Sequence, residues 1–147
     1  MSLDNLYQEI ILEHYRHPQG KGISLENGVE VHHVNPSCGD EITLRVAIMD
    51  EKVGVSYHNT GCSISQASAS MMWELVHGKP ATEVLALEAE FLALMQSKGQ
   101  GTDEDESLSD AIAFVGVSQF PARVKCALLP WMALKDALLQ NLRSNNE

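Results

Sequence analysis

The chain has few residues of several kinds, and each shortage excludes a class of protein. Its 147 residues include only three cysteines, an odd number that suits a framework of disulfide bonds poorly. No apolar run approaches the roughly 20 residues that a membrane-spanning helix needs. Ten basic residues stand against twenty acidic ones, and the net charge of −10 disfavours nucleic acid and anionic membranes as partners.

Length and composition favour one folded domain over residues 1–147. Hydrophobic residues make up 44% and charged residues 20% of the chain, an ordinary globular balance. A chain of this size buries about two-thirds of its unfolded surface, so it needs no disulfides to fold. The segment Met1 to Asn5 lacks the basic and apolar stretches of a secretion signal. We therefore expect a cytoplasmic protein whose thiols stay reduced and serve as ligands or nucleophiles.

Alternating apolar residues predict a small antiparallel sheet. The alternation runs over residues 42–48 and 53–57, on either side of the turn 50–52, and it predicts a hairpin. Val29 and Val31 offer a third strand at the end of an extended linker. The expected sheet therefore has three strands.

Helical spacing of apolar residues predicts four helices around that sheet. They run over 3–15, 63–77, 81–95 and 121–142. We expect Ser63 or Ser65 to cap the second helix, and Pro130 to kink the long C-terminal one. Residues 97–109 predict a mobile surface loop, and the role of its acidic run 103–106 is open. The order of elements indicates an α+β fold with helices packed on the sheet.

The three cysteines and one aspartate form a candidate metal site. Cys38 and Asp40 precede the first hairpin strand, and Cys62 follows the second. Because hairpin strands run in opposite directions, these residues reach the same edge of the sheet. Cys126, in the first turns of the last helix, can cover that edge. Three thiols and a carboxylate are a tetrahedral set that zinc accepts, so the predicted metal ligands are Cys38, Asp40, Cys62 and Cys126.

Alternatives remain at this stage. Helix N-termini near Cys62 and Cys126 favour thiolates. However, a free cysteine is often only a small buried apolar residue, and Cys126 fits that description. The chain has no Cys-x-x-Cys pair. His33 or His58 could replace Asp40 as a ligand.

Four segments together resemble a known family. They are His17-Pro18, Asn35-Pro36-Ser37-Cys38-Gly39-Asp40, Gly61-Cys62-Ser63-Ile64-Ser65-Gln66-Ala67-Ser68 and Arg123-Val124-Lys125-Cys126-Ala127-Leu128. The chain resembles the IscU/NifU-like family of iron–sulfur cluster assembly proteins, and is most similar to its SufU branch. The resemblance implies one NifU N-terminal-like domain with a SufE/NifU-like fold. It also implies a zinc site at Cys38, Asp40, Cys62 and Cys126, or a transient iron–sulfur cluster on the cysteines. The implied partners are a SufS-like cysteine desulfurase and downstream iron–sulfur assembly proteins.

Two departures from the scaffold members favour the SufU branch. Scaffolds usually carry a histidine directly before the third cysteine, where this chain has Lys125. They also carry a Leu-Pro-Pro-Val-Lys segment for a chaperone, and residues 119–123 keep only one of its prolines. In addition, the region 85–118 is longer than in the scaffolds.

Three hypotheses follow. In the first, the protein is a zinc-dependent sulfur acceptor, and Cys38 receives persulfide sulfur after it leaves the zinc ion. A histidine of the partner then takes the place of Cys38 on the zinc, and Arg123 stabilises the displaced Cys38 thiolate. In the second, the protein is a scaffold that assembles a transient [2Fe–2S] or [4Fe–4S] cluster and transfers it to apo-proteins. In the third, the zinc is purely structural. The sequence leaves open whether the protein is a sulfurtransferase or a non-enzymatic scaffold.

Overall fold

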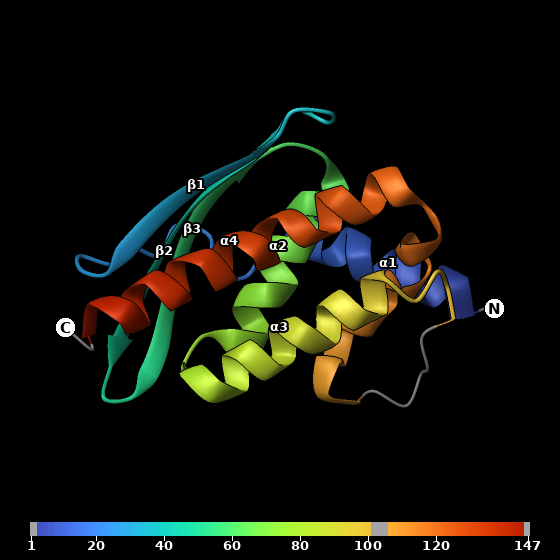
Figure 1. Cartoon of the computed structure of the whole chain (residues 1–147). Coiled ribbons are helices and arrows are strands. Elements are labelled where there is room, and N and C mark those ends of the chain that lie inside the picture. Colours follow the sequence, from blue (N-terminus) through green and yellow to red (C-terminus); the bar gives the residue numbers. More distant parts are fainter. Residues whose placement is uncertain (1–2, 101–105, 146–147) are drawn as a thin grey trace.

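The computed structural model describes residues 3–100 and 106–145, and helices cover one face of an antiparallel sheet (Figure 1). The elements, in chain order, are α1 (Leu3–Arg16), β1 (Val29–Asn35), β2 (Asp40–Met49), β3 (Lys52–Thr60), α2 (Ser63–Val76), β4 (Lys79–Pro80), α3 (Ala81–Met95), the 3-10 segments η1 (Glu106–Val115) and η2 (Val117–Gln119), and α4 (Pro121–Asn145).

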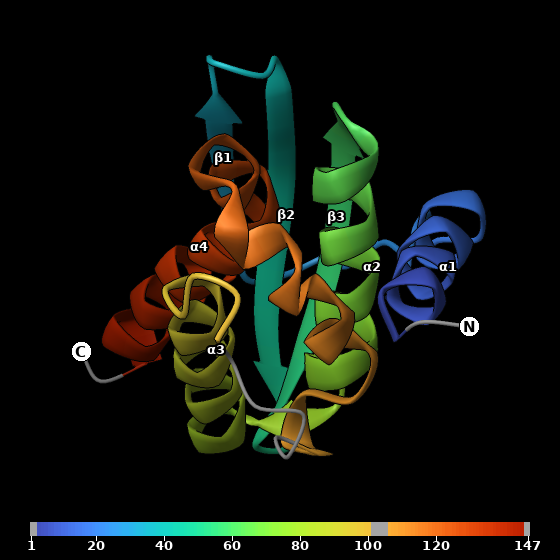
Figure 2. The same ribbon diagram turned by 90° about the vertical axis from the view of Figure 1, so that its right-hand side faces the viewer.

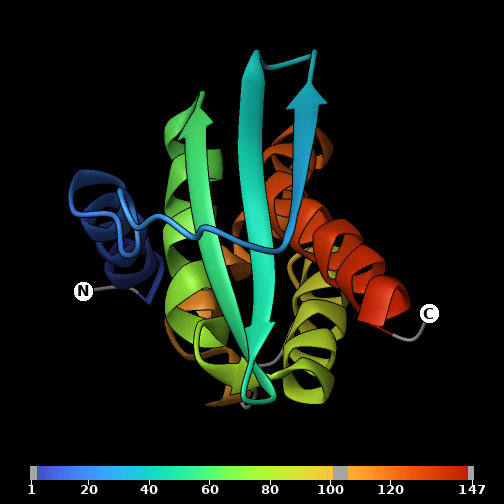
Figure 3. The same ribbon diagram turned by 90° about the vertical axis from the view of Figure 1, so that its left-hand side faces the viewer.

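The layers separate clearly when the molecule is turned. α4 lies against β1 and β2, α2 lies against β3, and α1 packs on the outer side of α2 (Figure 2). The opposite face of the sheet is crossed by the segment between α1 and β1 (Figure 3). The α+β class, the helices on the sheet and the long C-terminal helix are thus as the sequence predicts. No helix within the described ranges is long and apolar enough to cross a bilayer.

The sheet has one strand more than predicted. Its order is β1-β2-β3-β4, antiparallel throughout, and the three long strands are the predicted ones. β4 pairs only at Lys52↔Pro80 and Val53↔Lys79. A two-residue strand is too short to leave an alternating pattern of apolar residues, so it could not be predicted from the sequence.

Side chains cover part of the open edge of β3. Trp73 Nε1 donates to the carbonyl of Val55 at 2.8 Å, and the amide of Val55 donates to Nδ1 of His77 at 3.1 Å. The hydroxyl of Tyr57 donates to the carbonyl of Gln19 at 2.7 Å. The two bonds at Val55 satisfy backbone groups that would otherwise offer an edge for pairing with another chain, and the Tyr57 bond ties β3 to the segment that follows α1.

The core lies between the sheet and the helices. Met71, Met72 and Trp131 are buried, whereas Trp73 is half-buried at the β3 edge. Trp131 stacks on Phe91 with ring centroids 4.6 Å apart, which joins α4 to α3. This packing holds the first turns of α4 over one end of the sheet.

Two local predictions need correction. The N-cap of α2 is Cys62, with no side-chain cap, and Ser65 instead donates to the Cys62 carbonyl at 3.1 Å. Residues 106–109, which the sequence predicts to be part of a loop, form the start of η1. Residues 101–105, which include most of the acidic run 103–106, lie outside the described residues. α4 continues through Pro130 as one helix, and the predicted kink stays a prediction.

Candidate metal centre

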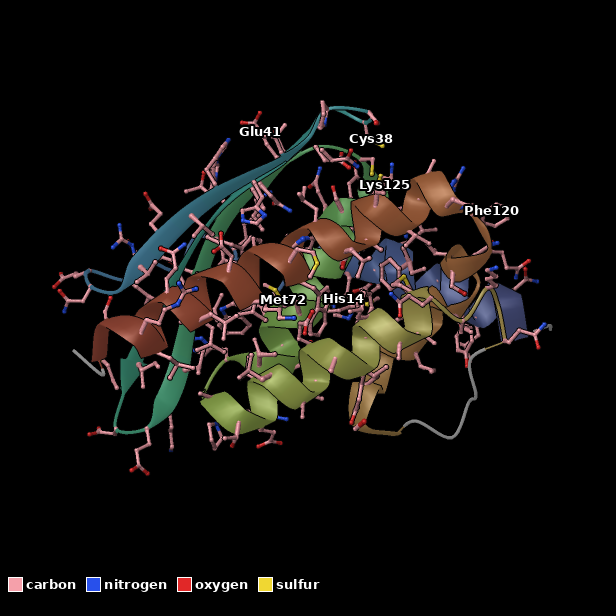
Figure 4. All side chains as sticks on the ribbon, viewed as in Figure 1. His14, Cys38, Glu41, Met72, Phe120 and Lys125 are labelled. Atoms are coloured by element: carbon pink, nitrogen blue, oxygen red, sulfur yellow. The ribbon has the colours of Figure 1, made fainter. Side chains whose placement is uncertain are left out.

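Cys38, Asp40 and Cys126 meet where β1 turns into β2. The Sγ atoms of Cys38 and Cys126 lie 3.0 Å apart, and one ligand atom from each of the three residues lies within 4.8 Å of the others. Cys38 stands on the turn beside the first half of α4 (Figure 4). Segments distant in sequence therefore meet as the hairpin geometry predicts.

Cys62 joins this group through Asp40. Its amide donates to Oδ1 of Asp40 at 2.7 Å, and its Sγ lies 3.5 Å from Oδ2 of the same carboxylate. Asp40 is fully buried at 0% exposure. A buried carboxylate needs hydrogen bonds or a cation, and here the backbone supplies one of them.

Gly61 makes this approach possible. The register places Glu41 opposite Thr60, so Gly61 follows the strand end that faces Asp40. A Cβ at position 61 would lie 2.2 Å from Oδ1 of Asp40, and Gly61 has φ +139°. Both the contact and the backbone conformation require glycine at this position.

Asn35 is a contributor that the sequence-based set of site residues missed. It is buried at the end of β1, pairs with Asp40 in the sheet, and lies with its Nδ2 3.8 Å from the Sγ of Cys126. Its carbonyl accepts from the amide of Cys38 at 3.2 Å. Asn35 begins the Asn-Pro-Ser-Cys-Gly-Asp segment, and this position could have indicated its part in the site.

The electrostatics of the cluster call for a cation. Burial raises the pKa of the Cys126 thiol, and contacts with Cys38, Asp40 and Cys62 raise it further. Four acidic groups this close cannot all lose their protons without positive charge among them.

The donor set fits zinc. A tetrahedral ion with zinc–sulfur bonds of about 2.3 Å places its sulfur ligands about 3.8 Å apart. The Cys38 and Cys126 sulfurs are 3.0 Å apart, so they would move apart slightly to hold such an ion, and the ligand atoms of Cys38, Asp40 and Cys126 all lie within 4.8 Å of one another. Zinc would be held by these two cysteines with Asp40 and Cys62, all of them residues that the sequence nominates.

The histidine alternatives lie outside the cluster. His33 Nε2 pairs with Oδ2 of Asp136 on α4 at 2.8 Å, and this hydrogen bond lowers the pKa of the Asp136 carboxyl. His58 is exposed on β3. Neither belongs to the group of ligand atoms around Asp40.

Arg123 is exposed in the first turn of α4, three positions before Cys126. Its guanidinium carbon is 6.0 Å from the ring centroid of Phe120. It lines a hollow of about 530 Å³, together with Tyr7 of α1 and with Ser63 and Ile64, which directly follow Cys62. Arg123 thus shares this hollow with the residues that follow Cys62, and its role in chemistry stays a prediction.

A buried aspartate among three thiols, at one end of a sheet covered by helices, makes this group a candidate metal centre on an α+β scaffold. Residues 6–127 match the family model described as NifU-like N terminal domain. The chain therefore belongs to the NifU-like N-terminal domain family, as the motifs indicate.

Two relatives with different names are similar over nearly the whole chain. The zinc-dependent sulfurtransferase SufU of Bacillus subtilis is 39% identical over 145 residues, which cover 98% of this chain and 97% of the relative. The iron–sulfur cluster assembly scaffold protein IscU of Streptococcus pyogenes is 36% identical over 145 residues, which cover 98% and 89%. Relatives of both kinds thus match this chain.

Solved structures agree on the fold. A SUF-system cluster assembly scaffold from Fervidobacterium islandicum has a TM-score of 0.71 at 34% identity, covering 93% of this chain and 99% of its own. A NifU-like N-terminal protein from Brucella abortus has a TM-score of 0.83 at 24% identity, covering 96% and 97%. At this lower identity the second match supports the fold alone.

Proposed function

We propose that this protein is a zinc-dependent sulfur acceptor in iron–sulfur cluster assembly, and that it takes persulfide sulfur from a cysteine desulfurase. One observation carries the proposal. Cys38 is exposed, whereas Cys62 is half-buried and Cys126 is buried in the same cluster. A partner's persulfide can therefore reach one thiol of the set while the others remain enclosed.

The roles divide along this difference in exposure. Asp40, Cys62 and Cys126 hold the ion, since they are fixed by the sheet and by the starts of α2 and α4. A bound zinc ion would keep its cysteine ligands deprotonated. Cys38 stands on a turn with Gly39 at φ +70°, and this loop can move more readily than a cysteine in a helix.

Sulfur transfer needs no additional oxidant. The Cys38 thiolate attacks the outer sulfur of the partner's persulfide, and the bond between the two partner sulfurs breaks. The partner's cysteine leaves as a thiolate, and Cys38 then carries the persulfide. We assign to Arg123 the stabilisation of negative charge on Cys38 during this exchange.

The particular residues and relatives favour this function over a scaffold. Lys125 stands where the scaffolds usually have histidine, and the similar Bacillus subtilis protein is named for zinc-dependent sulfur transfer. The scaffold function remains the second candidate, because relatives named as scaffolds match nearly as well and three thiolates can hold a cluster.

The test measures sulfide release by a SufS-type desulfurase with this protein as acceptor. We expect Cys38→Ala to abolish the acceleration, while Ser37→Ala, on the same exposed turn, leaves it unchanged. Normal acceleration by Cys38→Ala would refute the assignment.

Anaerobic reconstitution separates the two candidates. A cluster that passes intact to an apo-protein, with no effect on the desulfurase, supports the scaffold. Its absence, together with desulfurase activation, supports the acceptor, which then passes sulfur to downstream assembly proteins.

A further inference from the structure

A second group of potential metal ligands lies away from the cysteines. His14 of α1, Glu74 of α2 and Asp110 of η1 each place a ligand atom within 4.8 Å of the other two. His14 is only 6% exposed although its helix is on the outer side of the molecule, and its Nε2 lies 3.0 Å from Oδ2 of Asp110. Three separate elements therefore converge on one imidazole.

The other ring nitrogen of His14 has a fixed partner. Its Nδ1 lies 2.7 Å from Oγ of Ser70, which also accepts from the amide of Gln19 at 2.8 Å. Metal-bound histidines almost always donate their second ring N–H to such a partner, which orients the ring. Without a cation, the Nε2–H of His14 donates to the Asp110 carboxylate. A bound cation would take the place of that proton, and Nδ1–H would then donate to Ser70 Oγ.

The charges around His14 are unbalanced. Glu9 and Glu13 line a hollow of about 300 Å³ together with His14 and Asp110, and Glu74 adds a further carboxylate beside it. Over residues 3–100 and 106–145, no ion pair joins a lysine or arginine to any of these four acids. Carboxylates this close to one another favour the arrival of a cation.

We propose that His14, Glu74 and Asp110 bind a first-row divalent cation, in a site separate from the thiolate centre. One imidazole nitrogen and two carboxylates are donors that suit Mn²⁺, Fe²⁺ or Zn²⁺, and they lack the sulfur that selects softer ions. Ser70, which orients His14, follows Cys62 by eight positions along α2. At the rise of an α-helix this separation is about 12 Å, so the two sites do not share ligands. The site stands whether or not Cys38 accepts sulfur.

Binding at this site would join three elements. α1 and η1 both pack on α2, and the cation would connect one side chain from each of the three. A ligand that binds only the folded state stabilises it in proportion to the logarithm of its concentration. We therefore expect Mn²⁺ to raise the melting temperature.

The test uses Mn²⁺ as the probe on protein carrying one equivalent of zinc. Electron paramagnetic resonance measures free Mn²⁺ during the titration, and electron spin-echo modulation detects nitrogen bound to it. We expect one saturable Mn²⁺ per chain with a histidine nitrogen signal. The thiolate centre cannot give that signal, because its predicted ligands include no imidazole.

Variants make the assignment specific. Glu74 is exposed, so Glu74→Gln should fold normally. It should weaken Mn²⁺ binding about tenfold or more, which is the loss of affinity that follows removal of a supporting residue at a metal site. Glu51→Gln, at the exposed hairpin turn, is the matched control and should bind as the wild type does. His14→Asn should remove the nitrogen signal. No saturable binding, no nitrogen signal, or equal affinity in Glu74→Gln would overturn the proposal.

Discussion

The amide of Cys62 donates a 2.7 Å hydrogen bond to Oδ1 of Asp40, and this bond ties the end of β3 to the first residue of β2. It holds the buried carboxylate so that its second oxygen faces the Cys62 sulfur at 3.5 Å. One backbone bond thus positions two of the four proposed zinc ligands, and their contribution can be separated by mutation.

Asp40→Asn and Asp40→Ala should have different effects. Asparagine keeps an oxygen that can accept from the Cys62 amide, so this variant should fold yet hold zinc more weakly, because the charged donor is lost. Alanine also leaves the amide without its partner, which costs about 1–3 kcal/mol. Zinc affinity by chelator competition and urea unfolding measure the two effects. Equal zinc affinity in Asp40→Asn and the wild type would contradict the role of the carboxylate.

Gly61→Ala should damage the metal centre more than an ordinary glycine substitution does. The new Cβ would meet Oδ1 of Asp40 at 2.2 Å, in a backbone conformation of φ +139°. Gly78→Ala is the matched control, since its φ is +87° with nothing within 4 Å of the added Cβ. Backbone strain costs about 1–3 kcal/mol at either position. Only Gly61→Ala should also lose zinc affinity, and similar affinity in both variants would count against the close approach.

The pair of His33 and Asp136 should make stability depend on pH. The hydrogen bond from His33 is the main cause that lowers the pKa of Asp136 in the folded state. A depressed carboxyl pKa adds stability above the unfolded value of about 3.9, and this contribution disappears as the pH falls through the folded pKa.

Asp136→Asn should therefore be less stable than the wild type at neutral pH, with the difference shrinking in acid. Urea unfolding over a pH series measures this, with Glu26→Gln, at an exposed position, as the control. A difference that persists below the folded pKa would mean that the pair acts through packing instead.

Arg123→Ala should slow sulfur transfer without removing zinc. The guanidinium shares a hollow with Ser63 and Ile64, which directly follow Cys62, and Arg123 is not one of the proposed zinc ligands. We expect a lower rate at saturating desulfurase, with partial recovery in Arg123→Lys because the charge returns. Metal analysis serves as the control. A loss of zinc in Arg123→Ala would instead make this residue part of the structural support.

The sequence could predict the cysteine cluster because hairpin geometry is simple. Once residues 42–48 and 53–57 are recognised as paired strands, Cys38, Asp40 and Cys62 must share one end of the sheet. The place of Cys126 also follows, since the last helix begins at Pro121. The family motifs then suggest the metal and the partner that we propose, which spacing alone could not.

Other features depend on packing that no local pattern records. β4 is two residues long, and Asn35 contributes through a side chain whose direction depends on the β1–β2 register. His14 falls in the predicted helix 3–15, where no apolar pattern marks it as buried. Its burial follows from tertiary contacts of α1 with α2 and η1. Such groupings need the fold before they can be seen.

In our proposal, Cys38 is the residue that accepts sulfur. Mass spectrometry after incubation with a cysteine desulfurase and free cysteine tests it most directly, with zinc content measured on the same sample. We expect one added sulfur atom on the peptide that contains Cys38, in protein that still holds zinc. Added sulfur on Cys62 or Cys126, or none on any of the three while an intact cluster passes to an apo-protein, would contradict it.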